Sequence, residues 1–130
     1  MTNLVETTTG RSVPEVIDTL RAALARRGIR VFAVIDHAAA AREAGLELHD
    51  ETVVVFGDPA VGTALMLADP RAGIDLPLRI VAWSDGQRTH VAYRDIRDLS
   101  KAFDVASEHE VIGRLGALLP QLVAEMTTGD

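Results

Sequence analysis

The sequence predicts one α+β domain over residues 1–130, in which a mostly antiparallel sheet carries two long helices packed on one face. Two stretches near the ends of the chain repeat apolar residues at helical spacing. Between them lie short runs rich in β-branched residues, which are typical of strands. An Asp-Gly pair between two such runs indicates an antiparallel hairpin.

The first two elements are a strand and a long helix. Residues 3–9 are rich in Thr and Val and predict the strand. Ser12 and Glu15 have the spacing of a capping box, and Pro14 is tolerated in the first turn of a helix. Gly28 suits the position just after its end. We therefore expect the first long helix between Ser12 and Gly28.

The middle of the chain predicts two apolar strands separated by short helices. Residues 30–35 and 52–56 predict the strands, and the Ala-rich residues 38–44 predict a short helix between them. Asp58, followed by Pro59, has the character of a helix cap, and this helix is expected to run to about Ala68.

The last elements are a hairpin and the second long helix. Residues 78–83 and 89–93 flank the Asp-Gly turn and predict the hairpin. Ser107 and Glu110 have capping-box spacing and predict the start of the helix, in which Pro120 should produce a kink or bend. The predicted order is strand, helix, strand, strand, hairpin, helix.

The two central strands are apolar at nearly every position, whereas a sheet with one face in water alternates apolar and polar residues. The face away from the long helices must therefore be covered, either by the short helices or by a second subunit. We expect a homodimer as the simpler cover.

Composition excludes several classes of function. The net charge is -6 with no basic stripe, so nucleic acid is not an expected partner. The absence of cysteine excludes disulfides, thiolate metal sites and thiol catalysis. The four histidines have no i, i+4 pair, so we expect neither a metal site nor a cofactor. No leader peptide and no apolar run of roughly 20 residues is apparent, so we expect no membrane association and a cytoplasmic location.

Residues 28–100 carry a series of short motifs. They are Ile35-Asp36-His37, Gly45-Leu46-Glu47-Leu48, Phe56-Gly57-Asp58-Pro59, Gly62-Thr63 and Gly73-Ile74-Asp75-Leu76-Pro77-Leu78. In these motifs the chain resembles the DUF302 family of bacterial and archaeal domains of unknown function. The resemblance implies a β-α-β(4)-α fold of TBP-like architecture and a homodimer, and it implies no activity. Asp58 departs from the Asn that the family often has there.

Asp36 and His37 are the first candidates for chemistry. A carboxylate and an imidazole can orient each other and transfer protons near neutral pH. However, neighbouring residues that leave a strand point to opposite sides. The alternative is structural: Asp36 caps the Ala-rich helix, which is the favoured interpretation, and His37 bonds a backbone carbonyl.

The segment from Gly57 to Thr63 is the second candidate. A strand, a turn and a helix start leave backbone N–H groups that can bind an anion, and Thr63 adds a hydroxyl. The lysine of a nucleotide-binding loop is missing, so we expect no nucleotide site. The favoured alternative is turn chemistry, with Gly62 and Thr63 allowing close helix packing.

Three further residues complete the candidate site. Asp75 is either a second carboxylate beside Asp36 or His37, or a loop residue that accepts backbone hydrogen bonds. Trp83 and Tyr93 fall on the hairpin strands, where aromatic residues usually pack but can also line a pocket.

The sequence leaves three hypotheses for function. The first is a homodimeric module that binds a small polar metabolite or anion in a pocket at the strand ends. The second is a small enzyme with His37 as general acid/base, and the third is a self-association domain without a ligand. The first hypothesis places seven residues at the site: Asp36, His37, Gly62, Thr63, Asp75, Trp83 and Tyr93. It requires His37, Thr63 and Asp75 to converge on one cavity.

Overall fold

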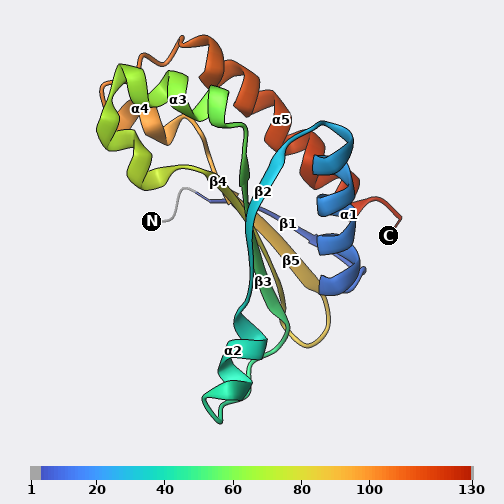
Figure 1. The fold of residues 1–130 in the computed structure, drawn as a ribbon. Helices are drawn as coiled ribbons and strands as arrows, with labels where there is room; N and C mark the ends of the chain where they lie inside the picture. The colour runs from blue at the N-terminus through green and yellow to red at the C-terminus, as the bar shows by residue number, and fades with distance from the viewer. Residues whose placement is uncertain (1–3, 130) are drawn as a thin grey trace.

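The computed structural model describes residues 4–129, which form one five-stranded sheet with helices (Figure 1). The strand order is β1-β5-β4-β3-β2, and every neighbouring pair is antiparallel. In chain order the elements are β1 (Leu4–Thr9), α1 (Val13–Arg26), β2 (Arg30–Asp36), α2 (His37–Glu43), β3 (Glu51–Gly57), α3 (Pro59–Ala68), η1 (Pro70–Asp75), β4 (Leu78–Ser84), β5 (Thr89–Arg94), α4 (Asp98–Ala102) and α5 (Glu110–Thr127).

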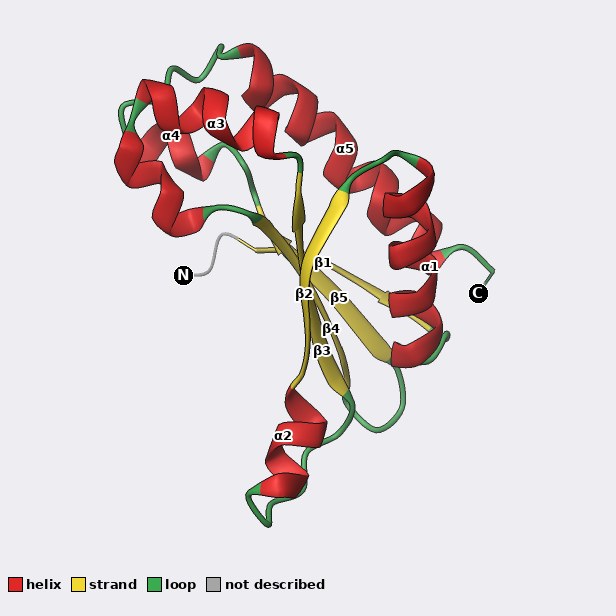
Figure 2. Ribbon diagram, in the orientation of Figure 1, coloured by secondary structure: helices red, strands yellow, loops and turns green. Residues whose placement is uncertain are grey.

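The two long helices, α1 and α5, lie against the same face of the sheet (Figure 2). Their apolar stripes bury a core in which the sheet contributes alternate side chains of β3, β4 and β5, among them Val54, Phe56, Ile80, Val91 and Tyr93. The α+β class, the antiparallel sheet and the common face of the long helices are therefore confirmed.

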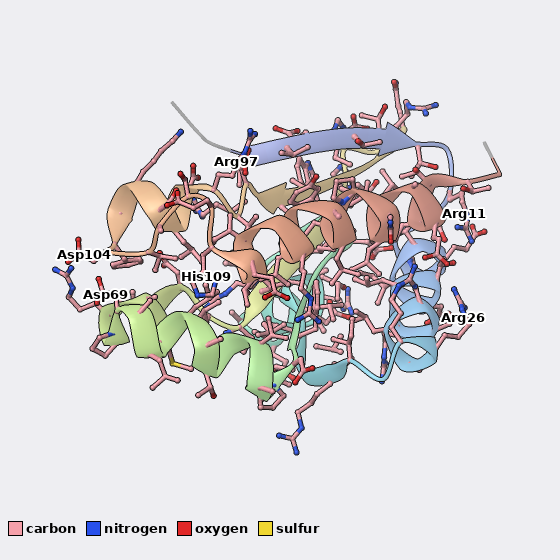
Figure 3. The ribbon with its side chains drawn as sticks, turned by 90° about the horizontal axis from the view of Figure 1, so that it is seen from above. Arg11, Arg26, Asp69, Arg97, Asp104 and His109 are labelled. Carbon is pink, nitrogen blue, oxygen red and sulfur yellow. The ribbon has the colours of Figure 1, made fainter. Side chains whose placement is uncertain are left out.

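The start of α1 is set by the predicted capping box. The Ser12 hydroxyl accepts a hydrogen bond from the backbone N–H of Glu15, and the Glu15 carboxylate accepts one from the N–H of Ser12, each at 3.2 Å. Gly28 has φ +66°, a conformation that glycine adopts without strain. Arg11 donates to the carbonyl of Met126 at 2.8 Å and so joins the start of α1 to the end of α5 (Figure 3).

The start of α5 differs from the prediction. The Ser107 hydroxyl donates to the carboxylate of Glu108, and the cap is His109, whose Nδ1 accepts from the N–H of Val111 at 3.1 Å. The capping box predicted from Ser107 and Glu110 is wrong, because the chain turns two residues later than the pattern suggested. The helix continues without a break through Pro120.

Two short elements, the 3₁₀ helix η1 and the helix α4, were not predicted. The 3₁₀ helix η1 follows α3, and its first turn is organised by the buried carboxylate of Asp69. This carboxylate accepts hydrogen bonds from the backbone and guanidinium of Arg71 and from the N–H of Asp104. The Arg71 guanidinium is the main reason that the pKa of Asp69 lies well below its usual range. Asp69 thereby joins η1 to the loop after α4, and the two segments lie side by side in Figure 3.

The opposite face of the sheet is not covered by a long helix. Within residues 4–129, α2 extends beyond one end of the sheet, while α3 and η1 lie near the other end (Figure 1). Ile35 on β2 is 43% exposed, and Val53 and Val81 beside it are half-buried. The short helices therefore leave Ile35, Val53 and Val81 only partly covered, whereas Val55 and Ala92 on the same face are buried.

Candidate functional site

A cavity of about 560 Å³ lies where β2 begins, β3 ends, and α3 and α5 approach each other. Its wall is mainly apolar, with side chains from all of these elements and from the segment before β4. The apolar lining comprises Ile29, Phe32, Phe56, Pro59, Val61, Met66, Leu76, Pro77, Leu78, Leu115 and Leu118. Met66 is 37% exposed and belongs to this wall.

Three arginines lie at the edge of this cavity: Arg27, Arg30 and Arg114. Arg27 is engaged, because it forms an ion pair with Glu125 at 2.7 Å and donates to the carbonyl of Ala23. The guanidinium of Arg30 lies 5.4 Å from the centre of the Phe32 ring. In the described part of the chain, neither Arg30 nor Arg114 forms an ion pair with a carboxylate. Two exposed cations, Arg30 and Arg114, thus border an apolar cavity in an acidic protein.

The first turn of α3 forms another part of the wall. Asp58 caps it, with Oδ1 accepting from the N–H of Ala60 at 2.9 Å. The Thr63 hydroxyl donates to the carbonyl of Pro59 at 2.7 Å, which uses its proton within the helix. The Asp58 carboxylate offsets the positive end of the helix dipole. The positive charge of this cavity therefore comes from the arginines.

Gly62 and Thr63 are the predicted site residues that the structure places in this cavity. Gly62 leaves room in the wall, since a Cβ atom there would make only an ordinary contact with Met66 at 3.9 Å.

Asp36 and His37 lie far from this cavity, at the end of the sheet that carries α2 (Figure 1). Asp36 caps α2 and accepts from the N–H of Ala39 at 2.8 Å, as the structural alternative predicted. His37 is the first residue of α2 and is exposed. Antiparallel pairing explains the separation: β2 ends where β3 begins, so residues that follow the two strands lie at opposite ends of the sheet.

Asp75 and Tyr93 line a second cavity of about 370 Å³, between the uncovered face of the sheet, η1 and α4. Tyr93 is 8% exposed. Burial is the main cause that raises the pKa of its hydroxyl, and the negative charge of Asp95 adds to the effect. Trp83 lies nearer the hairpin turn and stacks on His90, with ring centres 5.1 Å apart. The seven predicted residues therefore lie in different parts of the structure. The prediction that they line one shared pocket is wrong.

The structure also identifies site residues that the sequence reasoning missed, namely Arg27, Arg30 and Arg114. One signal was available for Arg30: it opens β2 and pairs with Gly57, at the end of β3. Arg114 lies in a distant helix and offered no local signal. Within residues 4–129, no three His, Asp or Glu side chains come together as ligands for a metal ion.

Comparison with known proteins places most of the chain in one family. Residues 5–125 match the family model described as domain of unknown function DUF302. The crystal structure of a DUF302 protein from Bacillus stearothermophilus superposes with a TM-score of 0.83, covering 97% of this chain and 99% of the other. The two sequences are 13% identical, so this likeness concerns the fold alone.

Curated relatives add a different kind of information. The proteins named fluoride-specific ion channel FluC 1 of Brucella suis and of Brucella abortus are each 42% identical to this chain over 83 residues. The match covers 64% of this chain but only 33% and 31% of those proteins. The chain thus corresponds to about a third of each channel protein. None of the helices between Leu4 and Gly129 combines the length and apolar character that a membrane-spanning helix requires.

Proposed function

Because the chain belongs to the DUF302 family, which carries no assigned activity, we propose its function from the cavity: a self-associating module that binds an organic anion with an apolar body. One observation carries this proposal. An apolar cavity of about 560 Å³, in a protein of net charge -6, is bordered by Arg30 and Arg114, which have no carboxylate partner in the described part of the chain.

The dimensions and lining suit a small organic molecule. Ligand pockets typically measure about 300–1,000 Å³ and combine apolar walls with a few polar groups that orient the ligand. Guanidinium groups bind carboxylates and phosphates through paired hydrogen bonds. The largely apolar wall favours an anion with a hydrocarbon or aromatic body over the small polar metabolite expected from the sequence.

The same lining favours binding over catalysis. The ionisable side chains among the described residues of this wall are Arg27, Arg30, Arg114 and Asp58. Arginine stays protonated in proteins and so cannot act as a general base, and Asp58 caps α3. His37, the proton-transfer group of the enzyme hypothesis, is the first residue of α2, which lies at the other end of the sheet (Figure 1).

We expect decanoate to raise the melting temperature, because a ligand that binds only the folded state stabilises it. Decanol, which has the same body without the charge, should have a much smaller effect. Arg30→Gln combined with Arg114→Gln should weaken decanoate binding at least about tenfold. Arg21→Gln, a change on the exposed side of α1, is the matched control and should bind as wild type does. Calorimetric titration and thermal shift provide the measurements.

A second variant separates the cavity from general surface charge. Gly62→Leu should fill the space beside Met66 and abolish decanoate binding without loss of fold. Equal binding of decanol and decanoate, or decanoate binding that ignores both the arginine and the glycine changes, would refute the proposal.

A second candidate function comes from the curated relatives, which are named as fluoride channels. A channel of this kind needs membrane-spanning segments, and none lies in the described residues, so this domain would act as a companion to the pore by sensing the ion. The same titration decides between the candidates when sodium fluoride is compared with sodium chloride. A stabilisation by fluoride alone that is lost with the two arginines, together with no response to decanoate, supports the companion function.

A further inference from the structure

The second cavity, of about 370 Å³, differs in its lining from the cavity of the proposed function. It is bordered by β4 and β5, by η1 and by the segment that leads from β5 into α4. The two cavities share residues 77–78 in their walls but no charged residue. Apolar side chains, among them Val53, Val81 and Ile96, form part of the second wall, and charged side chains of both signs complete it.

Two exposed arginines belong to this wall, namely Arg79 near the start of β4 and Arg94 at the end of β5. Ile80 pairs with Tyr93, so Arg79 and Arg94 are the next opposed residues of this antiparallel ladder. Like charges directly opposite each other are destabilising. In the described part of the chain, neither guanidinium forms an ion pair with a carboxylate. An anionic group bound by both arginines would relieve their repulsion.

Carboxylates from other segments line the same cavity. Asp98 is the first residue of α4, and its Oδ1 lies 4.0 Å from Nζ of Lys101. Its Oδ2 is buried and has no hydrogen-bond partner among the described residues, although buried polar atoms normally have one. Asp95 is engaged, because it accepts hydrogen bonds from the guanidinium of Arg97. Asp98 and the exposed Asp75 thus remain for a cationic group.

Tyr93 adds a neutral polar group to this wall. The residue is 8% exposed, and its hydroxyl forms no hydrogen bond with another described residue. A buried tyrosine hydroxyl usually has such a partner. Burial raises the pKa of the hydroxyl, so it stays protonated at neutral pH. It can therefore donate to a carboxylate oxygen of a bound molecule.

We propose that this cavity binds an α-amino acid with an apolar side chain. Arg79 and Arg94 bind its carboxylate, Asp98 accepts from its ammonium group, and its side chain packs against Val53 and Val81. The arginines and carboxylates of the wall form no ion pairs with one another. A simple anion would leave the carboxylates without a partner, and a simple cation would leave the guanidiniums without one, whereas a zwitterion satisfies both. The volume falls within the range of roughly 300–1,000 Å³ that is typical of ligand pockets.

Three probes that share one hydrocarbon body test the need for both charges. They are L-leucine, isocaproate, which lacks the ammonium group, and isoamylamine, which lacks the carboxylate. In calorimetric titrations of the wild type at neutral pH, L-leucine should bind at least about tenfold more tightly than either analogue. Each analogue leaves one set of charged side chains without its partner, and such a loss is strongly discriminated.

Two variants assign the charges of the ligand to their partners. Arg79→Gln combined with Arg94→Gln should weaken L-leucine binding at least about tenfold and remove its advantage over isoamylamine. Asp98→Asn should remove its advantage over isocaproate. Arg21→Gln, on the exposed side of α1, is the control for the arginine change. Asp104→Asn, at a side chain that is 93% exposed, is the control for the aspartate change.

Several outcomes would overturn this proposal. They are no binding of L-leucine at about 10 mM, binding of either analogue as tight as that of L-leucine, and L-leucine binding that neither variant weakens. Circular dichroism melts establish that each variant is folded, and the comparison of the three probes on the wild type decides the matter if a variant is not. Decanoate titration of the same samples is a separate test, so failure of this site and failure of the proposed function are distinguishable.

Discussion

Asp69 fixes the position of the segment that closes one wall of the cavity. Its carboxylate is buried and accepts hydrogen bonds from Arg71 and from the backbone N–H of Asp104. Gly73 and Leu76, a few residues further along the chain, belong to the cavity wall. A single carboxylate therefore holds together η1, the loop after α4 and, through them, the site.

Asp69→Asn should lower the free energy of unfolding at neutral pH, and the loss should shrink in acid. The pKa of Asp69 is lower in the folded chain than in the unfolded one, mainly because of the Arg71 guanidinium. Its contribution is therefore complete above the unfolded pKa of about 3.9 and disappears as pH falls through the lower folded pKa. Urea unfolding of both proteins at a series of pH values measures the difference.

Asp104→Asn is the matched control for this change. The Asp104 side chain is 93% exposed, and its nearest guanidinium atom, on Arg71, is 3.7 Å away. The bond to Asp69 comes from the Asp104 backbone, which the substitution preserves. We expect little change in stability at any pH. A wild-type-to-Asp69→Asn difference that stays constant from neutral pH to pH about 3 would contradict the assigned role.

The helix starts show where local sequence patterns suffice. Ser12 and Asp36 act as caps because the bonds they accept come from a backbone N–H only three residues further along the chain. The Ser107 pattern failed because His109 provides an equivalent acceptor closer to the first buried residues of α5. The elements α4 and η1 are too short to show an apolar periodicity in the sequence, and they depend on tertiary neighbours, so the sequence did not predict them.

Ser12→Ala should therefore destabilise the protein by about 1 kcal/mol, whereas Ser107→Ala should change stability by no more than about 0.5 kcal/mol. The first change removes the acceptor for the N–H of Glu15, while the second removes a contact with the exposed Glu108 carboxylate. Denaturant unfolding of the two variants in parallel measures both values. Equal losses would show that Ser107 caps a helix in solution after all.

The whole molecule explains why the fold was predictable and the site was not. Apolar periodicity and turn residues specify the strands and long helices locally, and their order limits the ways in which they pack. The cavity wall, in contrast, draws on four regions of the chain: residues 27–32, 56–63, 73–78 and 114–118. Arg30 and Arg114 meet there only through the register of β2 with β3 and the packing of α5 beside α3.

The two cavities have different charged residues, and we expect them to act independently. They share residues 77–78, whereas Arg30 and Arg114 belong to the first cavity and Arg79 and Arg94 to the second. Effects at separate sites with no shared partner usually add. The Arg79→Gln, Arg94→Gln variant should therefore change the decanoate dissociation constant less than about twofold, and the Arg30→Gln, Arg114→Gln variant should bind L-leucine as wild type does. Calorimetry with both ligands on the same samples measures both. A variant of the second cavity that also loses decanoate would mean that the shared wall couples the two cavities, because no charged residue belongs to both.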